Sequence, residues 1–274
     1  HVLFEFWQER VTPYHPPATA AAWLEAAGFT RLEEADYWNL EPGKGYYIVR
    51  NGSAVVAWRI PDHAIGGWRI TASHSDAPGW KIKSDTVQND GCRRLSVEGY
   101  GGMIMSSWLD RPLTVAGRVL LRTEDGVETR LVHFDRDLLV IPSLAIHMQR
   151  DVNQGHHYNP QIDMQPLWGP ADSRTLTDLL CEELGVKEED ILDRDLQLVT
   201  RQAPTVIGPD GQYFMAPRID DLECAATTLL GFIEAAAETD SACAPVWAML
   251  DNEEVGSSSR QGAQSSFLRD VLDR

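Results

Sequence analysis

The feature that most constrains this chain is an apolar run, Ala244 to Leu250, that leads directly into the acidic segment Asp251-Asn252-Glu253-Glu254. The run predicts a buried strand. Neighbouring side chains of a strand point to opposite faces, so two adjacent functional glutamates indicate that the strand has ended and a loop carries them. One carboxylate can then bind a metal while the other moves a proton, as metal-assisted hydrolysis requires. A solvated loop is the alternative that this segment alone leaves open.

Two further segments offer groups that can bind a metal. A strand pattern, Trp68 to Ser73, runs into His74-Ser75-Asp76 and stops at Pro78-Gly79, since proline and glycine end regular structure. If His74 binds a metal, Asp76 can accept a hydrogen bond from the imidazole nitrogen that is not on the metal. Asp220 precedes a long helical pattern, and it can either bind a metal or act only as the helix N-cap.

A series of short motifs carries a family resemblance. In chain order they are Thr12-Pro13-Tyr14-His15, Ala27-Gly28-Phe29, Trp38 with Pro42-Gly43, Arg50-Asn51-Gly52-Ser53, His74-Ser75-Asp76, Tyr100-Gly101-Gly102, Trp108-Leu109-Asp110-Arg111, Leu144-Ala145-Ile146-His147, Arg218-Ile219-Asp220, Asp251 to Ser257 and Gln261-Gly262-Ala263. With this order, which spans nearly the whole chain, the sequence resembles the aspartyl aminopeptidase family of co-catalytic zinc exopeptidases.

The resemblance implies a role for each matching residue. His74 would bind one metal ion, Asp220 would bridge two, and Glu254 would bind the other, with zinc as the expected metal and manganese or cobalt as alternatives. Glu253 would be the general base, and Asp76 would orient His74. The implied activity is a metalloprotease of the aminopeptidase class, a hydrolase that releases N-terminal Asp or Glu from peptides.

The resemblance also implies two features that a structure can examine. His147 would reach into a neighbouring subunit's site and help to hold the substrate, which makes the protein a homo-oligomer; an ordinary half-buried histidine is the alternative. The peptide bond after Asp220 would be cis, with the Asp220 carboxylate turned toward His74 and Glu254. A plain N-cap would have a trans bond and a carboxylate on the helix amides. At Asp221 the chain departs from the family, which usually has Asn there.

The chain ends before two further family ligands, an Asp and a His, so we expect it to lack the C-terminal part of the catalytic domain. The three ligands present would give each of two ions about two protein ligands, whereas catalytic zinc usually has three. A catalytically inert assembly or binding form is therefore an alternative function. A related metallohydrolase with another N-terminal specificity is a second alternative, because the metal motif does not encode pocket selectivity.

Composition bears on partners and compartment. The 274 residues carry a net charge of -17, which argues against nucleic acid or an anionic membrane as a partner. Acidic peptides would also be repelled at long range, so we expect a local basic pocket, for which Lys81, Lys83, Arg111 and Arg150 are candidates. No apolar run has the length of a membrane span. The scattered cysteines, Cys92, Cys181, Cys224 and Cys243, favour reduced core thiols in a cytoplasmic protein.

The pattern along the chain predicts an insertion. Tyr46 to Arg50 and Ala54 to Ile60 read as a hairpin across Asn51-Gly52, and a β-rich pattern replaces the catalytic pattern after His74. The resemblance implies an α/β fold: a zinc-exopeptidase-like catalytic domain, residues 1–85 and 214–274, with an inserted β-rich oligomerisation domain, residues 86–213. The ligands would lie at strand ends, where sites of open sheets usually occur.

Overall fold

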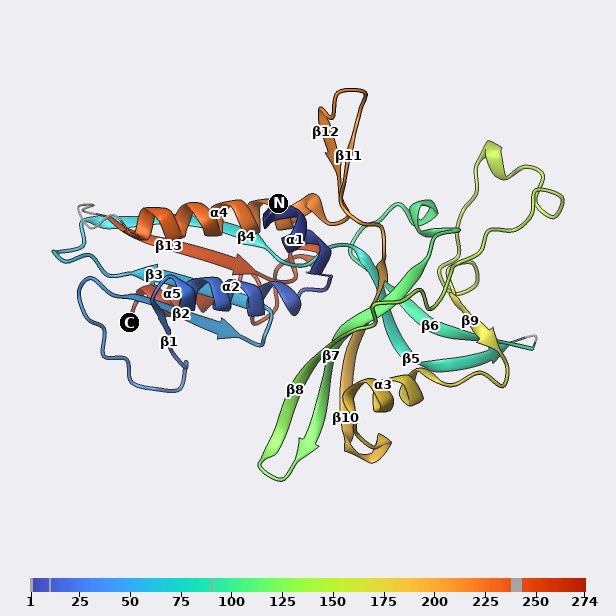
Figure 1. The fold of residues 1–274 in the computed structure, drawn as a ribbon, viewed down its shortest axis with the longest axis horizontal. Helices are drawn as coiled ribbons and strands as arrows, with labels where there is room; N and C mark the ends of the chain where they lie inside the picture. Colours follow the sequence, from blue (N-terminus) through green and yellow to red (C-terminus); the bar gives the residue numbers. More distant parts are fainter. Residues whose placement is uncertain (1, 10, 90, 238–242) are drawn as a thin grey trace. The chain divides into compact units, whose positions relative to one another are not determined.

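The computed structural model describes residues 2–9, 11–89, 91–237 and 243–274. The chain forms two compact units, one of His1–Ala77 with Pro204–Arg274 and the other of Pro78–Ala203 (Figure 1). The second unit is therefore inserted between two segments of the first. The boundaries lie at 78 and 204 rather than at the predicted 86 and 214. Strand β5 (Gly79–Asn89) already pairs within the sheet of the second unit, which moves the first boundary toward the N-terminus.

The first unit is built on a five-stranded sheet in the order β1-β2-β3-β13-β4. Its strands are β1 (Phe29–Arg31), β2 (Gly45–Arg50), β3 (Ala54–Arg59), β4 (Gly67–His74) and β13 (Cys243–Leu250), and its helices are α1 (Val2–Glu9), α2 (His15–Ala26), α4 (Ile219–Ala237) and α5 (Phe267–Leu272). The pairs β1–β2 and β4–β13 are parallel, and the other pairs are antiparallel. A separate two-stranded hairpin, β11 (Thr205–Ile207) with β12 (Tyr213–Met215), precedes α4.

Alternation along the central strands explains the layers of this unit. Side chains of one face pack with α2 and α4, and they include Tyr47, Val55, Ala57, Trp247 and Met249. Side chains of the other face pack with α5, and they include Ile48, Val56, Trp58, Val246 and Ala248. A strand that is covered on both faces reads as a continuous apolar run. This is why the predicted strand before Asp251 has no polar alternation.

The second unit contains a six-stranded antiparallel sheet in the order β8-β7-β10-β5-β6-β9. Its other strands are β6 (Cys92–Tyr100), β7 (Leu113–Thr123), β8 (Gly126–His133), β9 (Leu167–Pro170) and β10 (Ile191–Thr200), with helix α3 (Leu176–Leu184) and short 3-10 turns η1 (Met105–Trp108), η2 (Val152–Gln154) and η3 (Glu188–Asp190). Helix α3 buries Leu176 and Leu180 in the core of this sheet. A Thr175 capping box starts the helix and Gly185 ends it.

The predicted mixed α/β fold class is confirmed by the two sheets and their helices. The β2–β3 hairpin also forms, with Asn51 and Gly52 both at positive φ. Within the described ranges, no helix is both long and apolar enough to cross a bilayer. The prediction that the cysteines are core residues is wrong, because Cys224 is exposed and Cys92, Cys181 and Cys243 are half-buried.

Candidate metal centre

The His74 and Glu253-Glu254 motifs meet because β4 and β13 are parallel neighbours. Leu250, the last residue of β13, pairs with His74, the last residue of β4. Both chains therefore leave the sheet at the same edge, and the Ser75 amide donates to the Leu250 carbonyl at 2.9 Å. Residues 74–76 and 251–254 are far apart in the sequence, but this register places them side by side. Carboxyl ends of parallel strands are a usual location for active sites in open sheets.

Asp76 joins the two motifs. Its side chain is 0% exposed, and its two carboxylate oxygens accept from the main-chain amides of Glu253 at 3.1 Å and Glu254 at 3.2 Å. These amides begin the 3-10 turn η4 (Glu253–Val255), which follows Asn252 in the left-handed region. Hydrogen bonds from main-chain amides to a carboxylate are charge-assisted and stronger than those between neutral groups. Asp76 thus holds the main chain of the two glutamates and also contacts the histidine.

His74 is oriented by the same aspartate. Its Nδ1 lies 3.1 Å from the Asp76 carbonyl oxygen and 3.3 Å from Asp76 Oδ1, which leaves Nε2 to face the acidic groups. Burial by itself lowers the pKa of His74, but the hydrogen bond and the charge of Asp76, with the charges of Asp221 and Glu253, raise it to about 9. A metal needs the neutral imidazole, so metal binding and protonation compete at this residue.

Asp220 faces His74. Its Oδ1 lies 3.2 Å from His74 Nε2, although the Asp220 side chain is 86% exposed. The Asp220–Asp221 peptide bond is cis, and both residues have non-helical backbone angles at the start of α4. This arrangement is the one that the resemblance implies, and it differs from the trans bond of a plain N-cap. The neighbouring Asp221 accepts from the His74 amide through Oδ2 at 3.1 Å.

His74, Glu253 and Glu254 form the candidate metal cluster. Each residue offers one ligand atom, and the three atoms lie within 4.8 Å of one another. Glu253 Oε2 also lies 3.9 Å from His74 Nε2. Burial raises the pKa of Glu254, although the positive charge of His74 opposes this rise. An imidazole nitrogen with carboxylate oxygens is a donor set that zinc accepts. The cluster fits a zinc ion chemically, and Asp220 lies beside it, next to His74.

His147 lies in the inserted unit and is exposed in a turn. His147 is therefore not a half-buried histidine, which was the alternative. The loop that carries it is fixed at its base, because Asp110 accepts from the amide of Ser143 at 2.8 Å and also contacts the Ser143 hydroxyl. These bonds lower the pKa of Asp110. The side chain of His147 is thus available to a neighbouring molecule.

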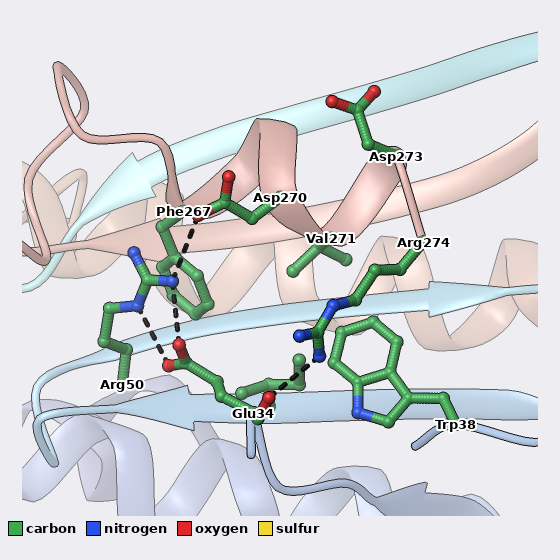
Figure 2. Close-up of a pocket in the computed structure, with 9 residues that line it drawn as sticks. Glu34, Trp38, Arg50, Phe267, Asp270, Val271, Asp273 and Arg274 are labelled. Carbon is green, nitrogen blue, oxygen red and sulfur yellow. Dashed lines mark hydrogen bonds and ion pairs between the residues drawn. The ribbon is translucent and has the colours of Figure 1, made fainter. Parts of the chain in front are cut away.

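A cavity of about 330 Å³ lies beside α5 and has Arg50 at its edge. Figure 2 shows the Arg50 guanidinium between Glu34 and the Phe267 ring. The guanidinium binds Glu34 through two bonds of 2.9 and 2.8 Å, lies 3.6 Å from Asp270, and stacks 4.1 Å from the ring centroid. Arg50 also donates to the Arg260 carbonyl. This cluster fixes the segment after the glutamate loop to the β2–β3 hairpin, and its Glu34 and Asp270 carboxylates are paired with Arg50.

Comparison with known proteins identifies the family. The model of the family described as aminopeptidase I zinc metalloprotease (M18) matches residues 6–274. The chain belongs to this family. It is 36% identical over 283 residues to a probable M18 family aminopeptidase 2 of Clostridium novyi, covering 99% of this chain and 65% of the relative. The predicted resemblance is therefore confirmed.

Solved structures agree with the sequence match. Chaetomium thermophilum mApe1 superposes with a TM-score of 0.92 at 28% identity, covering 98% of this chain and 66% of that one. The S. cerevisiae mApe1 dodecamer gives a TM-score of 0.86 at 26% identity, covering 99% and 64%. The chain thus spans about two thirds of the length of the relatives that it matches.

Two features of the centre escaped the sequence analysis. Asp76 was predicted only as a partner of His74, and its bonds to the Glu253 and Glu254 amides depend on the β4–β13 register. In the sequence Asp221 is only a departure from the family, whereas in the structure its carboxylate accepts from the His74 amide. The adjacent carboxylates at 220 and 221 were the only available signal, and they do not say which partner each one takes. The metal and catalytic roles of the predicted residues stay predictions.

Proposed function

We propose that the intact protein is a metal-dependent aminopeptidase that releases N-terminal Asp or Glu from peptides. The observation that carries the proposal is the cluster of His74, Glu253 and Glu254 with ligand atoms within 4.8 Å, in a chain of the M18 family. From this cluster His74 and Glu254 would hold zinc together with Asp220, which lies 3.2 Å from His74 Nε2, with two ions expected. Glu253 would stay free of the metal. Bound zinc would polarise the scissile carbonyl and lower the pKa of a water molecule.

Glu253 supplies the proton transfer in this proposal. Its side chain is 57% exposed, so it can reach a substrate, while its main chain is held by Asp76. A carboxylate in this position can take a proton from water and return it to the leaving amine. Asp76 orients both glutamates and the imidazole and does not contact the reacting atoms.

The two glutamates can be told apart by experiment. Glu253→Gln in the intact enzyme is expected to retain zinc but to lose at least ~100-fold in kcat, because an amide cannot accept the proton. Glu254→Gln is expected to lose zinc content instead. Metal analysis and turnover of both variants, with and without chelator, measure this. Full activity in excess chelator, or zinc loss in the Glu253 variant alone, would contradict the assignment.

Selectivity for acidic residues is a finer part of the proposal. Of the four basic candidates, Lys81 already binds Asp195 at 3.0 and 3.3 Å, whereas Arg111 has a buried Nε with no hydrogen-bond partner among the described residues. Arg111 is therefore the better candidate for binding a carboxylate. Peptides that differ only in N-terminal Asp, Glu, Asn or Leu test selectivity. Equal turnover of Asp and Asn peptides would favour a related metallohydrolase of different specificity.

Assembly and location complete the proposal. We propose a homo-oligomer, supported by the dodecamer of the S. cerevisiae neighbour and by the exposed His147, which would act in a neighbouring site. Sedimentation of the active enzyme tests it, and a fully active monomer would exclude a contribution from a second subunit. A cytoplasmic location is proposed from the free thiols of Cys92, Cys181 and Cys224, and cell fractionation tests it.

A further inference from the structure

The β11–β12 hairpin is an isolated element with apolar side chains on both faces. Its register pairs Val206 with Phe214 on one face and Ile207 with Tyr213 on the other. It forms a two-stranded sheet of its own, joined to neither larger sheet. Figure 1 shows it as a narrow projection that precedes α4. A two-stranded hairpin is marginally stable in water unless something packs against it.

One face of the hairpin contacts α1, although its Val206 and Phe214 side chains are still 57% and 41% exposed. The Phe214 ring lies 5.4 Å from the Trp7 ring and 6.2 Å from the Phe4 ring, both on α1. This contact fixes the direction in which the hairpin leaves its unit. The opposite face, formed by Ile207, Tyr213 and Met215, is exposed by 43%, 68% and 41%.

The face formed by Ile207, Tyr213 and Met215 has the composition of a protein interface. Three large apolar side chains lie next to one another there, with Ile207 directly opposite Tyr213 and Met215 two residues along the same strand. Adjacent apolar side chains that project from a small element are typical of protein contacts, whereas single exposed apolar residues are ordinary. Tyrosine is also among the residues that contribute most to binding at interfaces.

We propose that this face packs against a second copy of the chain. The chain carries a net charge of -17, so most pairs of like surfaces would repel one another. The hairpin segment 205–215 contains a single charged residue, Asp210, which makes it a place where two copies can approach at low electrostatic cost. The assembly of the S. cerevisiae neighbour as a dodecamer favours a second copy over an unrelated partner.

The contact would lie close to the metal centre along the chain. Four residues, 216–219, separate β12 from Asp220, and Arg218 among them donates to the Trp7 carbonyl of α1 at 3.4 Å. Covering the hairpin would therefore also hold the segment that presents Asp220. This inference rests on the proposed homo-oligomer. It adds that the face with Ile207, Tyr213 and Met215 forms part of the interface between subunits.

The test uses the intact protein with matched tyrosine substitutions. Tyr213→Ser is compared with Tyr37→Ser, since Tyr37 is 106% exposed in a loop of the same unit. Sedimentation over a concentration series should show the Tyr213 variant dissociating at about tenfold higher concentration or more, and the Tyr37 variant behaving as wild type. Far-ultraviolet circular dichroism should be unchanged in both. A Tyr213 variant that assembles like wild type would overturn the inference while leaving the proposed oligomer intact.

Photo-crosslinking gives a second measurement that does not depend on weakening the assembly. Benzoylphenylalanine at position 213 should yield a product of twice the subunit mass, and mixed isotope labelling should show that its two halves come from different copies. The same probe at position 37 is the control. A product of single-subunit mass would place another part of the same subunit on the hairpin and overturn the inference. A monomeric wild-type protein would instead refute the proposed assembly itself.

Discussion

Replacing Asp76 with Asn should expose the double role of this residue in the metal-free protein. The Asp76 carboxylate accepts from two amides and lies 3.3 Å from His74 Nδ1. The asparagine side chain has only one acceptor oxygen. One of the two hydrogen bonds from the main-chain amides is therefore lost, and that N–H faces the new NH₂ group. A lost hydrogen bond to a buried charged group costs about 1.5–3 kcal/mol. This part of the loss in unfolding free energy does not depend on pH.

The second part depends on pH through His74. Its pKa is about 9 in the folded protein and about 6.5 when unfolded. A raised folded pKa stabilises the protein below pH 6.5, and this stabilisation is lost as the pH rises through 9. The shift corresponds to roughly 3 kcal/mol. Most of it should disappear with the Asp76 charge, because the hydrogen bond to Asp76 and its charge are the largest causes that raise the pKa.

Urea denaturation of both proteins in chelator, at pH 6 and pH 9.5, measures the two parts separately. The variant should be less stable than wild type by about 5 kcal/mol at pH 6 and by about 2 kcal/mol at pH 9.5. Titrating groups that Asp76 does not influence are common to both proteins and cancel in the comparison. Asp36→Asn, at an exposed site, is the control and should stay within about 0.5 kcal/mol of wild type at both pH values. An equal gap at pH 6 and pH 9.5 would refute the coupling of Asp76 to His74.

Two substitutions test the surroundings of the centre. Arg50→Met should lower the unfolding free energy by about 1–3 kcal/mol, because the guanidinium is buried and its loss leaves the half-buried Glu34 carboxylate without its partner. Arg31→Met, in an exposed ion pair, should cost about 0–1 kcal/mol; equal losses in denaturation would contradict this ranking. Gly262→Ala should displace the glutamate loop, since a Cβ there would lie 2.2 Å from the Ser257 oxygen, and calorimetry should show weaker zinc binding. Gly231→Ala, which meets nothing within 4 Å inside α4, should bind zinc as wild type and be more stable by about 0.5–1 kcal/mol.

Several features followed from local sequence alone. The apolar run before Asp251 and the turn at Asn51-Gly52 predicted strand β13 and the β2–β3 hairpin correctly. A strand's period and its end are encoded in a few neighbouring residues, so a short window is enough. The ordered motifs likewise predicted the family that the comparisons confirm.

Other features depended on how distant segments pack. The sequence predicts His74 and Glu254 as metal ligands, but the parallel pairing of β4 with β13 decides that their side chains meet. It also decided that Asp76 holds the amides of the glutamate loop. The exposure of Tyr213 and Ile207 was equally invisible in the sequence, because an apolar β-hairpin reads the same whether or not the fold covers it. A short stretch of sequence fixes the period of an element and where it ends. The neighbours of that element in the fold, and the burial of its side chains, follow instead from the packing free energy of the whole chain, which no short stretch contains.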